Sequence, residues 1–332
     1  MTPPASDTRA ALQHDVDHPG RIRVLALAGL GRSGTTLIEY ALADGVTMAA
    51  LGEVVHLWER GLRRDELCGC GQPFSRCAFW QAVGARAFGG WDRVDADRMV
   101  ALVARVDRVV NIPRIAGPRA RGTFRHDLED YLWHFERLYE AATEVSGTRM
   151  VVDSSKQPSL FHALLASQRL DLRVLHCVRD PRAVAYAWTK HVRRPEARDE
   201  ADAFMTRYSP AKTARHWSIH NGAVESLRLR GAPVARLRYE DFLADPVGSV
   251  QRIQRFAGIE MPVPREGLTR HTLVLTPSHS CSGNPMRFGR GTLVLRADDA
   301  WRTGLPASDA RLVGAVTAPL MARYGYPFRT SG

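Results

Sequence analysis

The chain has 332 residues, of which 45% are hydrophobic and 24% charged, with a formal net charge of +11. This composition is typical of one large folded domain and excludes collagen, coiled coil and wholesale disorder. Lys156, Lys190 and Lys212 are the only lysines, so 43 of the 46 basic residues are arginine. Arginine suits a phosphorylated ligand, although the codon usage of a GC-rich genome explains it equally well. No basic run or zinc-finger spacing favours nucleic acid.

The first twenty residues are polar and lack the apolar core of a signal peptide, so we expect residues 1–20 to be a disordered tail. No apolar run in the sequence approaches the length that a membrane span needs. We therefore expect a cytoplasmic protein without a membrane span.

Buried strands and helices are predicted to alternate along the rest of the chain. A continuous apolar run, typical of a strand buried on both faces of a parallel sheet, occupies 22–29. Three more runs resemble buried strands, at 148–152, 172–178 and 234–239. Helical patterns occupy 34–43, 160–168, 181–191 and 247–257. The alternation predicts an α/β fold with a parallel β-sheet flanked by helices. We expect a single domain over 21–330, in which residues 58–147 form a mostly helical insertion over the active site.

A glycine-rich loop is predicted between the first strand and the first helix. It reads Gly-Leu-Gly-Arg-Ser-Gly-Thr-Thr from Gly29 to Thr36. In this context backbone N–H groups and the helix N-terminus form a pocket for an anion. Gly29 and Gly34 have Walker A spacing, but Thr35 stands at the lysine position and Arg32 supplies a cation instead. The loop therefore predicts P-loop-like phosphate binding without Mg-ATP hydrolysis. A tight turn without a ligand is the alternative.

With a second motif, this loop resembles that of the sulfotransferases that use 3′-phosphoadenosine 5′-phosphosulfate (PAPS). Gly-Arg-Ser-Gly-Thr-Thr resembles the family's 5′-phosphosulfate loop, and Arg179-Asp180-Pro181-Arg182 resembles its 3′-phosphate turn. The resemblance spans residues 22–328 and implies a bacterial enzyme with a P-loop-like fold. It implies transfer of a sulfuryl group from PAPS to a hydroxyl of a small molecule, lipid or sugar, with PAP as product. In the family a serine eight positions after the arginine shares the 3′-phosphate; here that position is Ala187.

The resemblance also implies which residues contact the donor. Tyr239 belongs to a family-like Arg-Tyr-Glu-Asp stretch, and Asn284 and Arg287 to a late loop that closes on the 3′-phosphate. The full predicted set is Gly31, Arg32, Ser33, Gly34, Thr35, Thr36, Arg179, Tyr239, Asn284 and Arg287. Trp301 and Arg302 could support the adenine. A structural role stands against several of these: Arg179 could cap a helix through Asp180, and Tyr239 and Trp301 could be packing residues.

In-line transfer at sulfur needs a base for the acceptor hydroxyl and donors for the sulfonyl and leaving oxygens. Arg32 suits the leaving phosphate and Lys156 the transferring group. Gly52-Glu53 resembles the glutamate-using branch of the family, so Glu53 is the predicted base. His56 is the second choice, and Asp153 and His279 are outside candidates. Apolar neighbours predict a raised pKa for Glu53. The alternative is that Glu53 only pairs with Arg32 or Arg60.

Because the leaving nucleotide phosphate is already stable as an anion, no metal is expected for this reaction. Cys68, Cys70 and Cys77 form a C-x-C-x6-C pattern. A zinc site needs four ligands, and this pattern offers only three, to which His56 could add a fourth. We expect buried thiols there; a disulfide or a metal site is the alternative.

Three other functions stay open at this stage. They are a P-loop kinase or NTPase, a non-catalytic nucleotide or nucleic-acid binding protein, and a sulfotransferase fold with another donor, which the alanine at 187 favours. Among partners we expect an acceptor molecule and no nucleic acid; the oligomeric state cannot be read from the sequence.

Overall fold

The computed structural model describes residues 20–117, 121–197, 203–261 and 265–328. Of the tail predicted at residues 1–20, only Gly20 lies within the described residues. Among those residues, no helix combines the length and the apolar character that crossing a bilayer requires.

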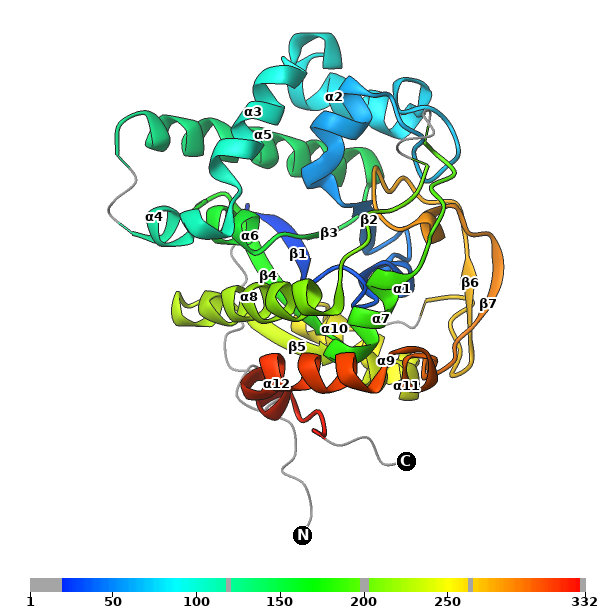
Figure 1. The fold of residues 1–332 in the computed structure, drawn as a ribbon. Coiled ribbons are helices and arrows are strands. Elements are labelled where there is room, and N and C mark those ends of the chain that lie inside the picture. The colour runs from blue at the N-terminus through cyan, green and yellow to red at the C-terminus, as the bar shows by residue number, and fades with distance from the viewer. Residues whose placement is uncertain (1–19, 118–120, 198–202, 262–264, 329–332) are drawn as a thin grey trace.

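Five parallel strands form the central sheet in the order β2-β3-β1-β4-β5 (Figure 1). They are β1 (Ile22–Ala28), β2 (Met48–Gly52), β3 (Met150–Lys156), β4 (Leu170–Val178) and β5 (Val234–Arg238). Four of them coincide with the four predicted apolar runs, and the predicted α/β fold with a parallel sheet is confirmed. β1 lies in the centre, and its register with β4 runs unbroken from Ile22↔Leu170 to Ala28↔His176.

Both faces of the sheet are covered by helices, as the apolar strands require. Alternate residues of β1 point to opposite faces. Val24 and Ala26 pack into one core with α5 (Thr123–Ser146) and α6 (Pro158–Leu164). Leu25 and Leu27 pack into the other with α1 (Thr35–Leu42) and α10 (Pro246–Phe256).

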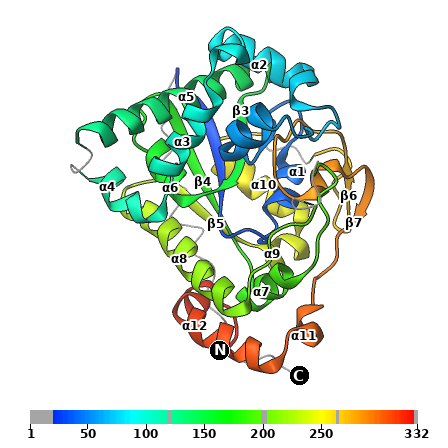
Figure 2. The same ribbon diagram turned by 45° about the horizontal axis from the view of Figure 1, so that its top comes forward.

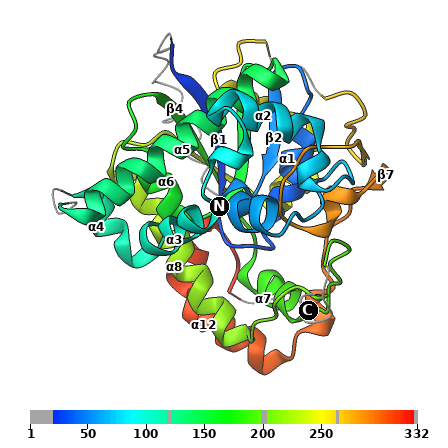
Figure 3. The ribbon, with the colours of Figure 1, turned by 90° about the horizontal axis from the view of Figure 1, so that it is seen from above.

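The segment between β2 and β3 is built from helices. A 3₁₀ turn (Val54–His56) and a π-helical turn (Leu57–Arg63) lead into α2 (Ala78–Phe88), α3 (Ala96–Val106), α4 (Ile112–Ala116) and α5. Figures 1 and 2 show α2, α3 and α5 stacked together above the sheet, and Figure 3 looks down on the side that they cover.

The second half of the chain adds a rim around the sheet. α7 (Pro181–Thr189), α8 (Pro210–Leu229) and α12 (Ala307–Tyr324) pack on one another beyond β4, and α9 (Tyr239–Ala244) follows β5. β6 (Thr272–Leu275) and β7 (Gly291–Val294) form a separate antiparallel pair, and α11 (Trp301–Gly304) precedes α12. The segment between β6 and β7, residues 276–290, returns to the sheet, where Cys281 N–H donates to the Leu51 carbonyl at 2.9 Å. We call it the late segment.

Candidate active site

Most of the predicted site residues meet at one edge of the sheet. The glycine-rich loop follows β1, Glu53 follows β2, Lys156 ends β3, Arg179 follows β4 and Tyr239 follows β5. Because all five strands are parallel, their carboxyl ends lie at the same edge, where open α/β sheets bind ligands. The topology thus brings together side chains that are separated by as much as two hundred residues in sequence.

The glycine-rich loop is shaped by two glycines with left-handed backbone angles. Gly29 has φ +135°, and a Cβ there would lie 2.3 Å from the Cys177 carbonyl oxygen. Gly34 has φ +84° and precedes α1, whose N-terminus receives no side-chain cap. Ser33 is buried, and within the described residues its hydroxyl has no hydrogen-bond partner. The loop therefore leaves helix-start amides and one buried hydroxyl available, which are the kinds of group that bind an anion.

Arg32 projects from this loop and contacts Met205 and Trp188. Its backbone is left-handed, with φ +75°, and its Nη2 donates to Met205 Sδ at 3.2 Å. The guanidinium lies over the Trp188 ring, 5.3 Å from the centroid, and Trp188 Nε1 donates to the Gly31 carbonyl at 3.0 Å. Burial lowers the pKa of Arg32, against the opposing charge of Glu53. Within the described residues, no carboxylate lies at ion-pair distance, so this cation is free to meet an anionic ligand.

Glu53 and Lys156 form an ion pair at the ends of β2 and β3. Lys156 Nζ donates to Glu53 Oε1 and, at 3.1 Å, to the Ser154 carbonyl. The Lys156 backbone is left-handed, with φ +65°, a conformation that costs free energy and is often found at functional sites. On its other side, Glu53 Oε2 lies 3.6 Å from His56 Nε2. The structure therefore joins the predicted base, the second choice and the predicted sulfonyl donor in one cluster.

The predicted rise in the pKa of Glu53 is wrong. Burial does act to raise it, but the charge and hydrogen bond of Lys156, with the charge of Arg60, outweigh burial and lower the pKa below its ordinary value. The alternative role for Glu53 was an ion pair with Arg32 or Arg60, but its ion-pair partner is Lys156. Arg60 Nη1 instead donates to Ser282 Oγ at 3.2 Å. Burial, with the neighbouring Arg60 and Lys156 charges, also lowers the pKa of His56, which favours the neutral imidazole.

The two outside candidates for the base have other surroundings. Asp153 is fully buried below the strand end and accepts hydrogen bonds from Tyr139 Oη at 2.6 Å and from Ser155 N–H at 2.7 Å. These bonds fix the end of β3, and burial raises the pKa of Asp153 to about 6. His279 lies among the cysteines, described below.

Sequence analysis missed Glu39, a buried carboxyl group beneath the site. Its Oε1 accepts from Gly52 N–H and its Oε2 from Ser154 Oγ, both at 2.8 Å. It thereby ties α1 to the ends of β2 and β3. Burial raises the pKa of Glu39 to about 7 from an ordinary 4.5. An acidic residue at the fifth position of an otherwise apolar helix was the only available signal.

This carboxyl group should make the protein less stable as pH rises. Because its pKa is raised, the contribution of Glu39 to folding stability is present below about pH 4.5 and is lost as pH rises through about 7. The shift corresponds to about 3 kcal/mol. We expect the free energy of unfolding, measured in urea, to fall less for Glu39→Gln than for wild type between pH 5 and pH 8. The exposed Glu129→Gln is the control, and a wild-type pH dependence in Glu39→Gln would contradict the prediction.

Arg179 lies beside the glycine-rich loop at the end of β4. Its Nη1 donates to the Arg32 carbonyl at 3.0 Å, its Nη2 to Asp298 Oδ2 at 2.7 Å, and its guanidinium lies over the Tyr239 ring. The helix cap that was the alternative role for Arg179 is made by its neighbour Asp180, which accepts a hydrogen bond from Arg182 N–H at 2.9 Å. Arg179 is therefore held at the loop by charge and aromatic contacts.

A cavity of about 540 Å³ opens beside Arg179. Its lining residues include Arg179, Arg238, Tyr239, Asp298 and Arg302. Trp301 also lines it, but this indole is 5% exposed and Arg182 lies over its ring, which is a packing arrangement. A larger cavity of about 730 Å³ lies near the start of β2; it contains none of the predicted donor residues and, of the candidates for the base, only His279.

Asn284 and Arg287 are engaged within the late segment. Asn284 Oδ1 accepts from Met286 N–H at 3.0 Å and caps a 3₁₀ turn, Pro285–Phe288. Arg287 was expected to be either a phosphate ligand or solvated, yet it is fully buried and donates to the Leu67 carbonyl at 3.0 Å.

Arg287 belongs to a buried ionic network that sequence analysis missed. Arg194 binds both carboxylate oxygens of Glu66, at 3.0 and 2.9 Å. Glu196 Oε1 lies 3.4 Å from both Arg194 Nε and Arg287 Nη1. The network connects the chain after α7, the segment before α2 and the late segment.

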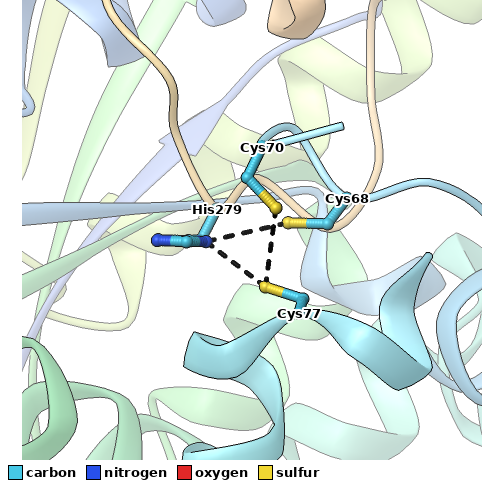
Figure 4. A group of neighbouring side chains, drawn as sticks. All are labelled: Cys68, Cys70, Cys77 and His279. Carbon is cyan, nitrogen blue, oxygen red and sulfur yellow. Dashed lines mark hydrogen bonds between the residues drawn. The ribbon is translucent and has the colours of Figure 1, made fainter. Parts of the chain in front are cut away.

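Cys68, Cys70 and Cys77 gather around His279, not around His56 (Figure 4). The three thiols are free in the structure.

Comparisons with known proteins agree with this architecture. The family model described as "Sulfotransferase family" matches residues 25–263. Carbohydrate sulfotransferase 3 from Tetronarce californica is 26% identical over 183 residues, and the human protein of that name is 29% identical over 183 residues. Each match covers 52% of this chain but only 40% and 37% of those proteins, respectively.

Two solved structures share the fold over nearly the whole chain. The sulfotransferase domain of the Synechococcus PCC 7002 olefin synthase has a TM-score of 0.50 at 18% identity and covers 95% of this chain and 98% of its own. The sulfotransferase domain from the curacin biosynthetic pathway has a TM-score of 0.51 at 14% identity, covering 94% and 99%.

Proposed function

The chain belongs to the sulfotransferase family and is an enzyme of that class, and from this premise we propose that it transfers a sulfuryl group from PAPS to a hydroxyl. The observation that carries the proposal is the meeting of the glycine-rich loop, the Glu53–Lys156 pair and Arg179 at one edge of the sheet. We further propose one domain over residues 21–330, with residues 58–147 as the helical insertion covering the site.

The free groups of the loop support PAPS as the donor. The N-terminal amides of α1, the Arg32 guanidinium and the Ser33 hydroxyl, which has no hydrogen-bond partner among the described residues, suit the 5′-phosphosulfate. Thr35 and Thr36 begin the same helix. Arg179 and Tyr239, beside the 540 Å³ cavity, suit the 3′-phosphate and adenosine. Arg238 and Arg302 line that cavity. They are our candidates for the hydrogen-bond donor to the 3′-phosphate that Ala187 cannot supply. The donor contacts predicted for Asn284 and Arg287 stay predictions.

The Glu53–Lys156 pair suggests how proton transfer and sulfuryl transfer are coupled. The Glu53 carboxylate accepts the proton of the acceptor hydroxyl, whose oxygen forms a bond to sulfur. The bond from sulfur to the 5′-phosphate oxygen breaks, and its electron pair leaves with PAP. Protonated Glu53 no longer compensates Lys156, whose ammonium is then available to the sulfonyl oxygens. Arg32 and the loop amides offset the charge that develops on the leaving phosphate.

Among hydroxyl acceptors, the comparisons favour a sugar. The curated relatives are named as carbohydrate sulfotransferases, although this chain matches less than half of their length. Hydroxylated small molecules and lipids are tested as acceptors beside the glycans. Mass spectrometry after incubation with PAPS should show a gain of one sulfuryl group on a glycan, and gain only on a non-sugar hydroxyl would contradict the sugar assignment.

Donor choice can be tested by thermal unfolding with PAP, PAPS, ATP and NAD in parallel. A ligand at one hundred times its Kd stabilises the native state by about 2.7 kcal/mol. We expect PAP to raise Tm by several degrees, ATP and NAD to raise it less, and Arg179→Gln to lose most of the PAP effect. Stabilisation by ATP above that by PAP would favour a kinase or NTPase instead.

A further inference from the structure

Three cysteines and one histidine outside the active site form a compact cluster (Figure 4). The Sγ atoms of Cys68, Cys70 and Cys77 and the Nδ1 atom of His279 all lie within 4.8 Å of one another. The Cys70 and Cys77 sulfurs are 3.8 Å apart, and His279 Nδ1 lies 3.3 Å from Cys77 Sγ and 3.9 Å from Cys68 Sγ.

These separations match the edges of a tetrahedral metal site. Zinc lies about 2.3 Å from thiolate sulfur and about 2.0 Å from imidazole nitrogen, so tetrahedral ligand atoms are separated by roughly 3.5 to 3.8 Å. A disulfide would need its two sulfurs at about 2.05 Å. The cluster therefore has the dimensions of a metal centre with an S₃N ligand set.

The cysteines are placed by local structure. Cys68 and Cys70 lie on a tight turn, closed by Cys68 N–H to the Gln72 carbonyl and Gly71 N–H to the Cys68 carbonyl, both at 2.8 Å. Cys77 occupies the N-cap position of α2, where helix amides favour an anionic sulfur. Both segments thus present sulfur at positions that suit a thiolate ligand.

His279 comes from the late segment and is held in place by contacts of its own. Its ring stacks on Phe79, with centroids 4.8 Å apart, and its carbonyl accepts from Trp80 Nε1 at 2.8 Å. Gly69 N–H donates to the Ser280 carbonyl at 2.9 Å, and a Cβ at Gly69 would lie 2.9 Å from Ser278 O. The fourth ligand position is therefore built by packing between two segments that are two hundred residues apart in sequence.

We propose that Cys68, Cys70, Cys77 and His279 bind one zinc ion that fastens the late segment to the start of α2. Thiolate-rich tetrahedral ligand sets select zinc over the hard divalent cations. Four protein ligands leave no open coordination position, so the ion is structural and takes no part in the chemistry. This proposal stands against the expectation of buried thiols without a metal, which rested on the lack of a fourth ligand nearby in sequence, and the metal analysis below decides between the two.

The proposed ion lies on the same segment that borders the catalytic carboxylate. Beyond His279, the late segment pairs with the end of β2, where Glu53 N–H donates to the Ser282 carbonyl at 3.2 Å. A Cβ at Gly283 would lie 3.1 Å from Glu53 Oε1. The metal thus stabilises one wall of the site, and its loss should loosen that wall.

The proposal is tested on the full chain by metal analysis. Protein produced with zinc in the medium should contain about one zinc per chain by elemental mass spectrometry. Refolding with Co²⁺ in place of zinc should give the intense visible bands of tetrahedral cobalt bound to thiolates. Cys70→Ser and His279→Ala should lose most of the bound metal, and His279→Cys should retain it.

Cys177→Ala is the matched control, because this buried free thiol in β4 lies outside the cluster and should keep the full zinc content. Folded wild type without zinc, without cobalt–thiolate bands, or with a disulfide among the three cysteines in non-reducing peptide mapping, would overturn the proposal. The metal measurement is independent of donor choice, so it fails or succeeds separately from the proposed function.

Discussion

Replacing Glu53 with glutamine is expected to lower turnover by roughly 10²- to 10⁴-fold, the usual contribution of a positioned general base. Glutamine keeps the size of the side chain but cannot accept the proton of the acceptor hydroxyl. It also leaves Lys156 without its carboxylate partner. Because the glycine-rich loop and Arg179 are untouched, PAP affinity should remain nearly unchanged. Single-turnover kinetics and PAP titration measure the two effects separately.

Two further measurements test Glu53 as the base: a variant of another carboxylate and the pH profile of the reaction. Glu59→Gln, which removes a half-buried carboxylate paired with Arg63 and Arg64, should leave turnover near wild type. Because Lys156 lowers the pKa of Glu53, the carboxylate is ionised above its ordinary value of 4.5, and activity is lost only as pH falls below that value. The kcat/KM profile should therefore be flat between about pH 6 and 8. Near-normal turnover in Glu53→Gln would remove Glu53 from the role of base.

Replacing Gly34 with alanine should abolish measurable PAP binding. The backbone there has φ +84°, and the added Cβ would lie 2.2 Å from the Tyr239 ring. The loop or the ring must move, and both belong to the proposed donor site. Strain of this kind also costs about 1–3 kcal/mol of stability. Calorimetric titration with PAP and urea unfolding measure the two losses.

Gly45→Ala is the control for strain alone. Gly45 also has a left-handed backbone, with φ +72°, but nothing lies within 4 Å of its added Cβ. We expect it to lose stability while keeping PAP affinity. A Gly34→Ala protein that binds PAP as tightly as Gly45→Ala does would show that the loop is not the donor site.

The sheet was predictable because its inner strands are apolar on both faces. β1 is aliphatic after Arg23 and β4 is mostly apolar and almost wholly buried, which is what two flanking helix layers require. β2 was missed, since Met48–Gly52 is short, rich in alanine and paired on one side only. The β6–β7 pair, four residues each, was missed for the same lack of a long apolar signal.

The site was predictable where motifs lie next to strand ends. The loop at Gly29–Thr36, Glu53, Lys156 and Arg179 each follow or end a strand, and parallel pairing alone brings them together. Side-chain electrostatics were not predictable in this way. Apolar sequence neighbours suggested a raised pKa for Glu53, but Lys156, a hundred residues away, reverses its direction.

The cysteine cluster illustrates the same limit. Spacing within 68–77 shows three ligands, and the fourth, His279, reaches them only through the fold. Glu39 and Arg287 were likewise out of reach, because their roles depend on burial against distant segments.

The buried network of Glu66, Arg194, Glu196 and Arg287 joins three segments of the chain: the one before α2, the one after α7 and the late segment. Each member pairs with an opposite charge from another of these segments, and a lone charge in that interior costs several kcal/mol. A partly assembled network is therefore unfavourable, so the three segments should become ordered together in an all-or-none step. The late segment, which borders Glu53, would then become ordered only together with the segments before α2 and after α7.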